Sequence, residues 1–269
     1  MERVFIVGFP RSGTTLVHGI LAASDVVLTF PETHYFARRF TGPIWKRMLV
    51  GRRRQLDKII ANIFALRKRE TMWKKIKPQL PDSSVDRFDF AITALALEEE
   101  KSVWVEKTPR HLYAIDKIQE TIPTATFIHV LREPVGAVKS YSRATSENPK
   151  DWSGKVDIPR SVKRWNSDLA QSLSYRNDPR HYMLRFDKLV SNPPDAIRDL
   201  CGFLKLPYSK SLLRPESSYD LIVMPWEKWK ANNEMPIGSQ SSPSTHNDAK
   251  WDEYIQEHCC GWDEVVSTL

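Results

Sequence analysis

A glycine-containing loop near the N-terminus carries residue types that bind phosphate-like anions. Residues 8–15 read G-F-P-R-S-G-T-T, which keeps the glycine spacing and the final hydroxyl of the nucleotide loop G-x-x-x-x-G-K-[ST]. Thr14 replaces the lysine of that loop, and Arg11 supplies a positive charge from its tip. Amides at a helix N-terminus, together with the helix dipole, attract an anion. The amides expected to line this anion site belong to Ser12, Gly13, Thr14 and Thr15.

The same loop lacks the groups with which kinases and ATPases hold Mg²⁺ and nucleotide. Those enzymes place the loop lysine on the β- and γ-phosphates and use an acid after a strand for the metal. The most apolar strand candidate, residues 125–131, is followed by Arg132, and Glu133 comes one residue later. We therefore predict an anion site without a metal. Two alternatives remain open: a kinase-like phosphotransferase on the same fold, and a non-enzymatic module that binds polyanions.

The elements that position this loop alternate between strands and helices. Apolar runs predict strands at residues 3–8, 26–30, 102–106, 125–131 and 181–186. Helices are predicted at residues 14–23, 111–122, 134–146 and 187–200, and one more near 251–260. Strands that alternate with helices favour an α/β fold, with a mostly parallel sheet flanked by helices. No linker-like stretch divides the chain, so we expect one domain over residues 1–269 with a helical insertion at about 38–100.

Three motifs resemble those of sulfotransferases that use 3′-phosphoadenosine 5′-phosphosulfate (PAPS). PRSGTT, directly after the first predicted strand, resembles the 5′-phosphosulfate loop of this family. FIHVLREPVGAVKSYSR places Arg132 at a strand end and Ser140 eight residues later, which resembles the pair that binds the 3′-phosphate. A guanidinium can bind a phosphate bidentately, and a hydroxyl can complete the contact. VEKTPRH, residues 105–111, resembles the Lys-Thr loop beside the transferred sulfuryl group, which assigns Lys107 to that group.

The resemblance implies a P-loop-like sulfotransferase fold and a sulfotransferase activity. The sulfuryl group would move from PAPS to a hydroxyl acceptor by in-line displacement, with release of adenosine 3′,5′-bisphosphate. The loop amides and Arg11 would stabilise the charge that develops on the leaving phosphate oxygen. The resemblance implies no metal.

The acceptor hydroxyl must lose a proton, and the sequence offers three candidate bases. Many animal members of the family place a histidine two residues after the lysine of the Lys-Thr loop, where this chain has Pro109. Glu32, which we take as the first choice, follows the second predicted strand, at a position where several bacterial members carry a glutamate base. Glu32 could instead cap the following helix, where an acid favours the dipole. His34 and His111 are alternative bases with intrinsic pKa values nearer neutrality.

The net charge of +7 is concentrated in one segment. Residues 46–77 contain twelve Lys and Arg against two acids. This segment is either a solvated helical face or a surface that docks an anionic acceptor, such as a carbohydrate, a lipid or a carrier-bound chain. We do not expect nucleic acid as the partner. No run approaches the ~20 apolar residues of a membrane span, and three sparse cysteines suggest no disulfide framework, so we expect a cytoplasmic protein.

Overall fold

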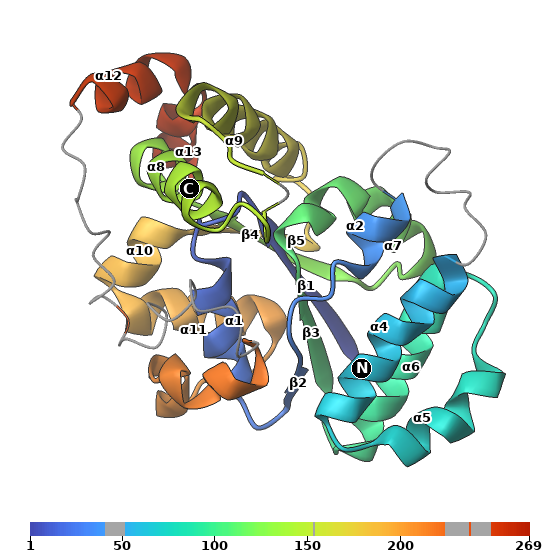
Figure 1. The fold of residues 1–269 in the computed structure, drawn as a ribbon. Helices are drawn as coiled ribbons and strands as arrows, with labels where there is room; N and C mark the ends of the chain where they lie inside the picture. The colour runs from blue at the N-terminus through green and yellow to red at the C-terminus, as the bar shows by residue number, and fades with distance from the viewer. Residues whose placement is uncertain (41–51, 153, 224–236, 238–248) are drawn as a thin grey trace.

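A single parallel sheet organises the molecule (Figure 1). The computed structural model describes residues 1–40, 52–152, 154–223, 237 and 249–269. Its strand order is β2-β3-β1-β4-β5, and every strand pair in these ranges is parallel. The strands are β1 (Glu2–Gly8), β2 (Val27–Thr29), β3 (Val103–Lys107), β4 (Thr126–Leu131) and β5 (His181–Arg185). The predicted α/β fold with a parallel sheet is therefore confirmed, and each strand lies within two residues of its predicted bounds.

Helices join and cover these strands. Those of the first half are α1 (Thr14–Ala22), α2 (Tyr35–Phe40), α4 (Arg52–Leu66), α5 (Glu70–Ile76), α6 (Ser84–Glu98) and α7 (Ile115–Thr121). Those of the second half are α8 (Pro134–Glu147), α9 (Ile158–Leu173), α10 (Phe186–Ser191), α11 (Pro193–Leu204), α12 (Ala249–His258) and α13 (Trp262–Thr268). The 3₁₀ helices are η1 (Lys77–Gln79), η2 (Pro109–Ala114), η3 (Lys210–Leu213) and η4 (Pro215–Leu221). Within the described residues, no helix combines the length and apolar composition that a membrane crossing requires.

Some of these helices differ from the predicted ones. Helix α9 was not predicted, although Asp157 caps it by accepting a hydrogen bond from the Arg160 amide at 2.9 Å. The predicted helix at 111–122 is in fact a 3₁₀ turn, η2, followed by the shorter α7. Pro109 favours this tight start because its fixed φ suits the first helical position.

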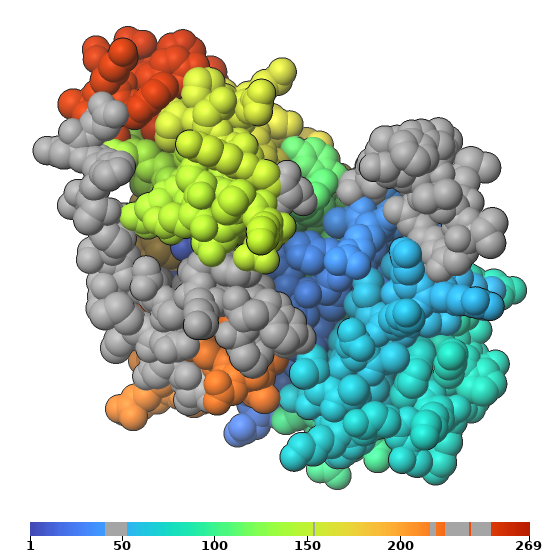
Figure 2. All heavy atoms as spheres, viewed as in Figure 1, coloured from blue at the N-terminus to red at the C-terminus, as the bar shows by residue number. Residues whose placement is uncertain are grey.

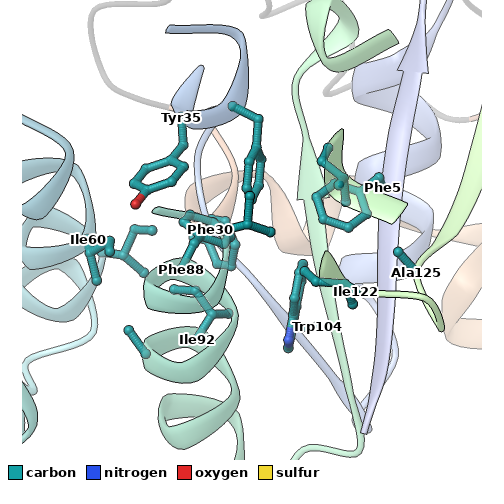
Figure 3. Close-up of a cluster of buried hydrophobic side chains, with 14 of the residues drawn as sticks. Phe5, Phe30, Tyr35, Ile60, Phe88, Ile92, Trp104, Ile122 and Ala125 are labelled. Carbon is teal, nitrogen blue, oxygen red and sulfur yellow. The ribbon is translucent and has the colours of Figure 1, made fainter. Parts of the chain in front are cut away.

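The sheet has two apolar faces because side chains alternate along each strand. Val4 and Ile6 of β1 pack with α1, α10 and α11 on one face. Phe5 and Val7 point to the other face and pack with α4, α6 and α7. Figure 3 shows this second cluster, in which the ring of Phe88 on α6 packs against Phe30 and against Trp104 of β3. The helices of residues 52–98 thus form part of the core that supports the sheet.

A third apolar cluster lies at the carboxyl end of the sheet. It joins Phe9 and Leu131, which follow or end the two central strands, to α8, α9, α12 and α13. Trp165 of α9 donates its indole N–H to the carbonyl of Arg132 at 3.2 Å. In the space-filling view, the blue residues of the N-terminal segment are recessed between the yellow-green α8–α9 region and the cyan α4–α5 region (Figure 2). This packing fixes the loops that leave the strands at that edge.

Candidate active site

The loop between β1 and α1 adopts a backbone conformation that only its glycines allow. Gly8 and Gly13 have φ values of 136° and 96°, in the region that side chains rarely adopt. A Cβ at Gly8 would lie 2.6 Å from the Val130 carbonyl oxygen, and one at Gly13 would lie 2.3 Å from the Phe186 ring. Arg11, at the tip, has a φ of 71° despite its side chain. The glycine spacing therefore encodes a tight turn pressed against β4 and α10.

The start of α1 presents polar groups suited to an anion. Gly13 is the N-cap and provides no side-chain hydrogen bond, so the first-turn amides lack a side-chain acceptor. Ser12 is buried at 1% exposure, and its hydroxyl has no hydrogen-bond partner among the residues that the structure describes. Thr14 is buried beside it. A buried hydroxyl without a partner is costly unless a ligand satisfies it, so these residues fit a bound phosphate-like group.

Two arginines and a serine from distant parts of the chain meet at this loop. Arg11 donates from Nε to the Ser140 hydroxyl at 3.3 Å. Arg132 donates from Nη1 to the Arg11 carbonyl at 3.0 Å, and its guanidinium lies 4.7 Å from the centre of the Phe186 ring. The structure thus brings together Arg11, Arg132 and Ser140, as their predicted shared site requires.

The electrostatics of this cluster favour a negatively charged ligand. Burial, followed by repulsion from Arg132 and Arg143, lowers the pKa of Arg11 to about 10. Burial also lowers the pKa of Arg132, although Glu133 opposes that effect. Both guanidinium groups are still charged at neutral pH. Cations that disfavour one another's charge in a partly buried site gain stability when an anion binds between them.

A second polar group forms where β2 and β3 end. Lys107 is 1% exposed, and its ammonium lies 2.6 Å from Oε2 of Glu32, which is 15% exposed. His34 Nε2 lies 3.5 Å from the other oxygen of Glu32. Burial is the main cause that lowers the pKa of His34, so its imidazole is neutral at neutral pH. Glu32 therefore lies beside Lys107, and His34 lies beside Glu32.

The third candidate base, His111, lies in a different environment. Its side chain is fully buried, and Nδ1 lies 2.7 Å from Oε2 of Glu106. Its Nε2 accepts a hydrogen bond from the Phe36 amide at 3.1 Å. Both ring nitrogens therefore face protein groups, which places His111 among the supports of the loops and leaves Glu32 and His34 as the better-placed bases.

Four neighbouring strands deliver these groups to one edge of the sheet. Arg11 follows β1, Glu32 follows β2, Lys107 ends β3 and Arg132 follows β4. The carboxyl ends of parallel strands are where open α/β sheets bind ligands. Within the described ranges, no group of three His, Cys, Asp or Glu side chains is arranged to hold a metal ion.

The basic segment at 46–77 lies only partly within the description, since residues 46–51 fall outside it. The turn between α4 and α5 places Arg67 2.8 Å from Glu99, at the end of α6. Glu99 precedes β3, so this turn lies near the amino ends of the strands, away from Arg11 and Glu32. The cations of that turn are thus not part of the site at the carboxyl edge.

The sheet order, the tight glycine loop and the arginines that follow β1 and β4 define a P-loop-like α/β protein with a cluster of cationic and polar groups at the carboxyl edge of its sheet. The family model described as "Sulfotransferase family" matches residues 3–210, so the chain belongs to the sulfotransferase family.

Relatives and solved structures agree with this membership. Protein-tyrosine sulfotransferase 1 of Danio rerio is 26% identical over 231 residues, which is 80% of this chain and 56% of that protein. The omega-hydroxy-beta-dihydromenaquinone-9 sulfotransferase of Mycobacterium bovis is 24% identical over 246 residues, which is 76% of this chain and 62% of that protein. The chain thus spans less than two thirds of the length of either relative.

Two solved structures share the fold. The sulfotransferase domain of the Synechococcus PCC 7002 olefin synthase superposes with a TM-score of 0.64 at 18% identity, over 96% of this chain and 94% of that one. A mouse sulfotransferase complexed with PAP gives a TM-score of 0.51 at 10% identity, over 95% of this chain and 82% of that one. At these identities the likeness concerns the fold alone.

Proposed function

We propose that this chain transfers a sulfuryl group from PAPS to a hydroxyl acceptor and releases adenosine 3′,5′-bisphosphate (PAP). The observation that carries the proposal is the contact of Arg11 with Ser140 and of Arg132 with the Arg11 carbonyl, beside the uncapped start of α1. Family membership supports sulfuryl transfer, and the PAP complex of the mouse structure supports the choice of donor.

The donor would lie along the carboxyl edge with its two phosphate ends on different groups. The amides of Gly13, Thr14 and Thr15 and the Ser12 hydroxyl would bind the 5′-phosphosulfate. Arg132 and Ser140 would bind the 3′-phosphate, since a guanidinium at a strand end can grip a phosphate bidentately. Arg11 contacts Ser140 and, through its carbonyl, Arg132, and it would stabilise the oxygen that leaves.

Transfer requires one bond to form and one to break at sulfur. The acceptor oxygen attacks sulfur, the bond from sulfur to the bridging phosphate oxygen breaks, and PAP leaves with that electron pair. The acceptor proton passes to the base. Lys107 would bind the equatorial sulfuryl oxygens, where its charge offsets the charge shared among them. Alignment and charge stabilisation supply most of the rate in such transfers.

Glu32 is the base that the geometry favours. It is largely buried and lies beside the lysine that would hold the sulfuryl group, so an acceptor placed there is within its reach. His34 lies on the other side of the Glu32 carboxylate and is the alternative base. Both ring nitrogens of His111 face protein groups, so we do not propose His111 as the base.

The acceptor class is a hydroxyl, but its identity is open among phenols, alcohols and sugars. By their names, the relatives act on protein tyrosine and on a hydroxylated menaquinone, which are chemically far apart. A screen with ³⁵S-labelled PAPS against 4-nitrophenol, tyrosine methyl ester, primary alcohols and sugars would identify the class.

A thermal-shift comparison tests the donor directly. PAP should raise the melting temperature of the protein, because a ligand that binds only the folded state stabilises it by an amount that grows with the logarithm of the ligand concentration above its dissociation constant. ATP with Mg²⁺ should raise it less, since the loop has Thr14 in place of lysine. Stabilisation by ATP with Mg²⁺ but not by PAP would refute the proposal and favour a kinase-like enzyme.

A further inference from the structure

A buried carboxylate joins the two loops that carry Glu32 and Lys107. Glu106, the penultimate residue of β3, is fully buried. Its Oε1 accepts hydrogen bonds from the hydroxyls of Thr33 at 2.6 Å and Thr108 at 2.8 Å. Its Oε2 lies 2.7 Å from Nδ1 of His111. Three groups from different parts of the chain thus hold both oxygens of this side chain.

Each of these three groups also accepts a hydrogen bond from a backbone amide after Glu32. The Thr108 hydroxyl accepts from the His34 amide, and the Thr33 hydroxyl accepts from the Tyr35 amide, both at 3.1 Å. His111 Nε2 accepts from the Phe36 amide, also at 3.1 Å. Three successive amides at the start of α2 are therefore tied, through one side chain each, to the same carboxylate. His34 takes a φ of 53° within this segment, which such contacts help to maintain.

Glu106 and the next residue, Lys107, point to opposite faces of the sheet because side chains alternate along a strand. Glu106 shares a face with Trp104, which packs in the cluster with Phe5, whereas Val103 and Val105 pack on the opposite face. Lys107 follows and contacts Glu32. Glu106 is fully buried and does not reach a substrate, so its effect must pass through the groups that it holds.

We propose that Glu106 is a positioning residue that sets the placement of Glu32 relative to Lys107, by fixing residues 33–36 and Thr108 in one hydrogen-bonded network. The proposal rests on the proposed function for the roles of Glu32 and Lys107. The network itself is independent of those roles. Burial alone would raise the pKa of Glu106, but His111 and the two threonine hydroxyls outweigh it and lower that pKa, so the carboxylate is charged at neutral pH.

The network needs a carboxylate and not merely a side chain of that shape. Because His111 Nε2 accepts from the Phe36 amide, the proton of the neutral ring lies on Nδ1 and faces Glu106. In a Glu106→Gln variant the amide must turn its NH₂ group either toward that Nδ1 proton or toward the two hydroxyls. If the NH₂ group faces His111, it opposes the Nδ1 proton, which is also a donor. If the NH₂ group faces the two hydroxyls, those hydroxyls lose the oxygen to which they donate.

Glu106→Gln should therefore lower kcat by about 10–100-fold, since a misplacement of about 1 Å at a reacting group can reduce the rate by about 10²-fold. The dissociation constant for PAP should change less than about threefold, because the residues proposed to bind PAP follow β1 and β4 and not β2 and β3. Turnover is measured as PAP release from PAPS with 4-nitrophenol as the acceptor probe, and PAP binding is measured by calorimetry.

A matched pair at Thr33 tests the network without touching the buried charge. Thr33→Val keeps the shape but removes the hydroxyl that donates to Glu106 and accepts from the Tyr35 amide. Thr33→Ser keeps that hydroxyl. We expect Thr33→Val to lose kcat as Glu106→Gln does and Thr33→Ser to retain most of it, with PAP binding unchanged in both. If Glu106→Gln fails to fold, this pair alone decides the question.

Hydrogen–deuterium exchange provides a readout that does not depend on activity. In Glu106→Gln and Thr33→Val, exchange should rise in residues 30–36 and 107–111, while residues 9–16 keep wild-type protection. Exchange that rises this way in a chain that neither binds PAP nor turns over PAPS would overturn the proposed function alone and support the network. Wild-type kcat and exchange in both variants, or equal losses of kcat and PAP affinity, would overturn the positioning role.

Discussion

Removing the Arg132 guanidinium should weaken the binding of PAP far more than the binding of adenosine 5′-phosphate, which has no 3′-phosphate. Arg132 is partly buried, lies over the Phe186 ring and faces the Arg11 carbonyl. A hydrogen bond between charged groups in such a site contributes about 2–3 kcal/mol. Arg132→Ala should therefore raise the dissociation constant for PAP by about 30–150-fold. Calorimetry with both nucleotides measures the difference.

Arg185 provides the matched control for this experiment. It also ends a strand, β5, but Asp187 lies 2.5 Å from its guanidinium and neutralises it. Arg185→Ala should leave the affinity for both nucleotides unchanged. If Arg132→Ala raises the dissociation constants of PAP and adenosine 5′-phosphate by the same factor, Arg132 supports the loop between β1 and α1 in general. Its assignment to the 3′-phosphate is then wrong.

Three further substitutions test the reaction and the fold. Arg11→Lys should lower kcat by about 10²–10³-fold in a PAPS turnover assay, because one ammonium cannot replace the guanidinium contacts with Ser140 and the leaving group; wild-type turnover would remove Arg11 from the mechanism. Glu32→Gln should lower kcat by about 10²–10⁴-fold with PAP binding intact, whereas a dead His34→Ala beside an active Glu32→Gln would make His34 the base. Burial chiefly lowers the pKa of His181 to about 4, so the unfolded chain binds more protons below pH ~6.5, and the free energy of unfolding should fall as the pH drops from about 6.5 to 4. Urea titrations of His181→Gln should show a shallower fall, and an unchanged slope would contradict the burial argument.

The anion half of the site could be predicted because local sequence determines it. The two glycines, the tip residue Arg11 and the start of α1 lie within eight residues, so the residue types of the turn and its helix start could be read from one short segment. Arg132 was predicted from the resemblance of its strand and helix to the family motif, and its place at a strand end agrees, since a parallel sheet brings such ends to one edge. What the sequence could not give was the contact of Arg132 with the Arg11 carbonyl, which joins residues 121 positions apart.

The base could not be chosen from the sequence because its candidates differ only in their tertiary partners. Glu32, His34 and His111 are all plausible by residue type, and only the contacts with Lys107, Glu106 and Phe36 separate them. One signal was available. In V-W-V-E-K a charged residue falls on the same face as a tryptophan in an apolar strand, and such a position predicts a buried carboxylate with polar partners.

The placement of that carboxylate explains why the position of Glu32 depends on the pairing of β2 with β3, whereas the loop after β1 depends on contacts with β4 and α10. The amides of residues 34–36 reach Glu106 only through side chains at 33, 108 and 111, so the Glu32 loop is fixed only after β2 and β3 have paired. The loop between β1 and α1 closes on its own glycines and on β4. Substitutions around Glu106 should thus lower kcat and leave the affinity for PAP unchanged. Substitutions at Gly13, whose added Cβ would clash with Phe186, should lower both kcat and the affinity for PAP.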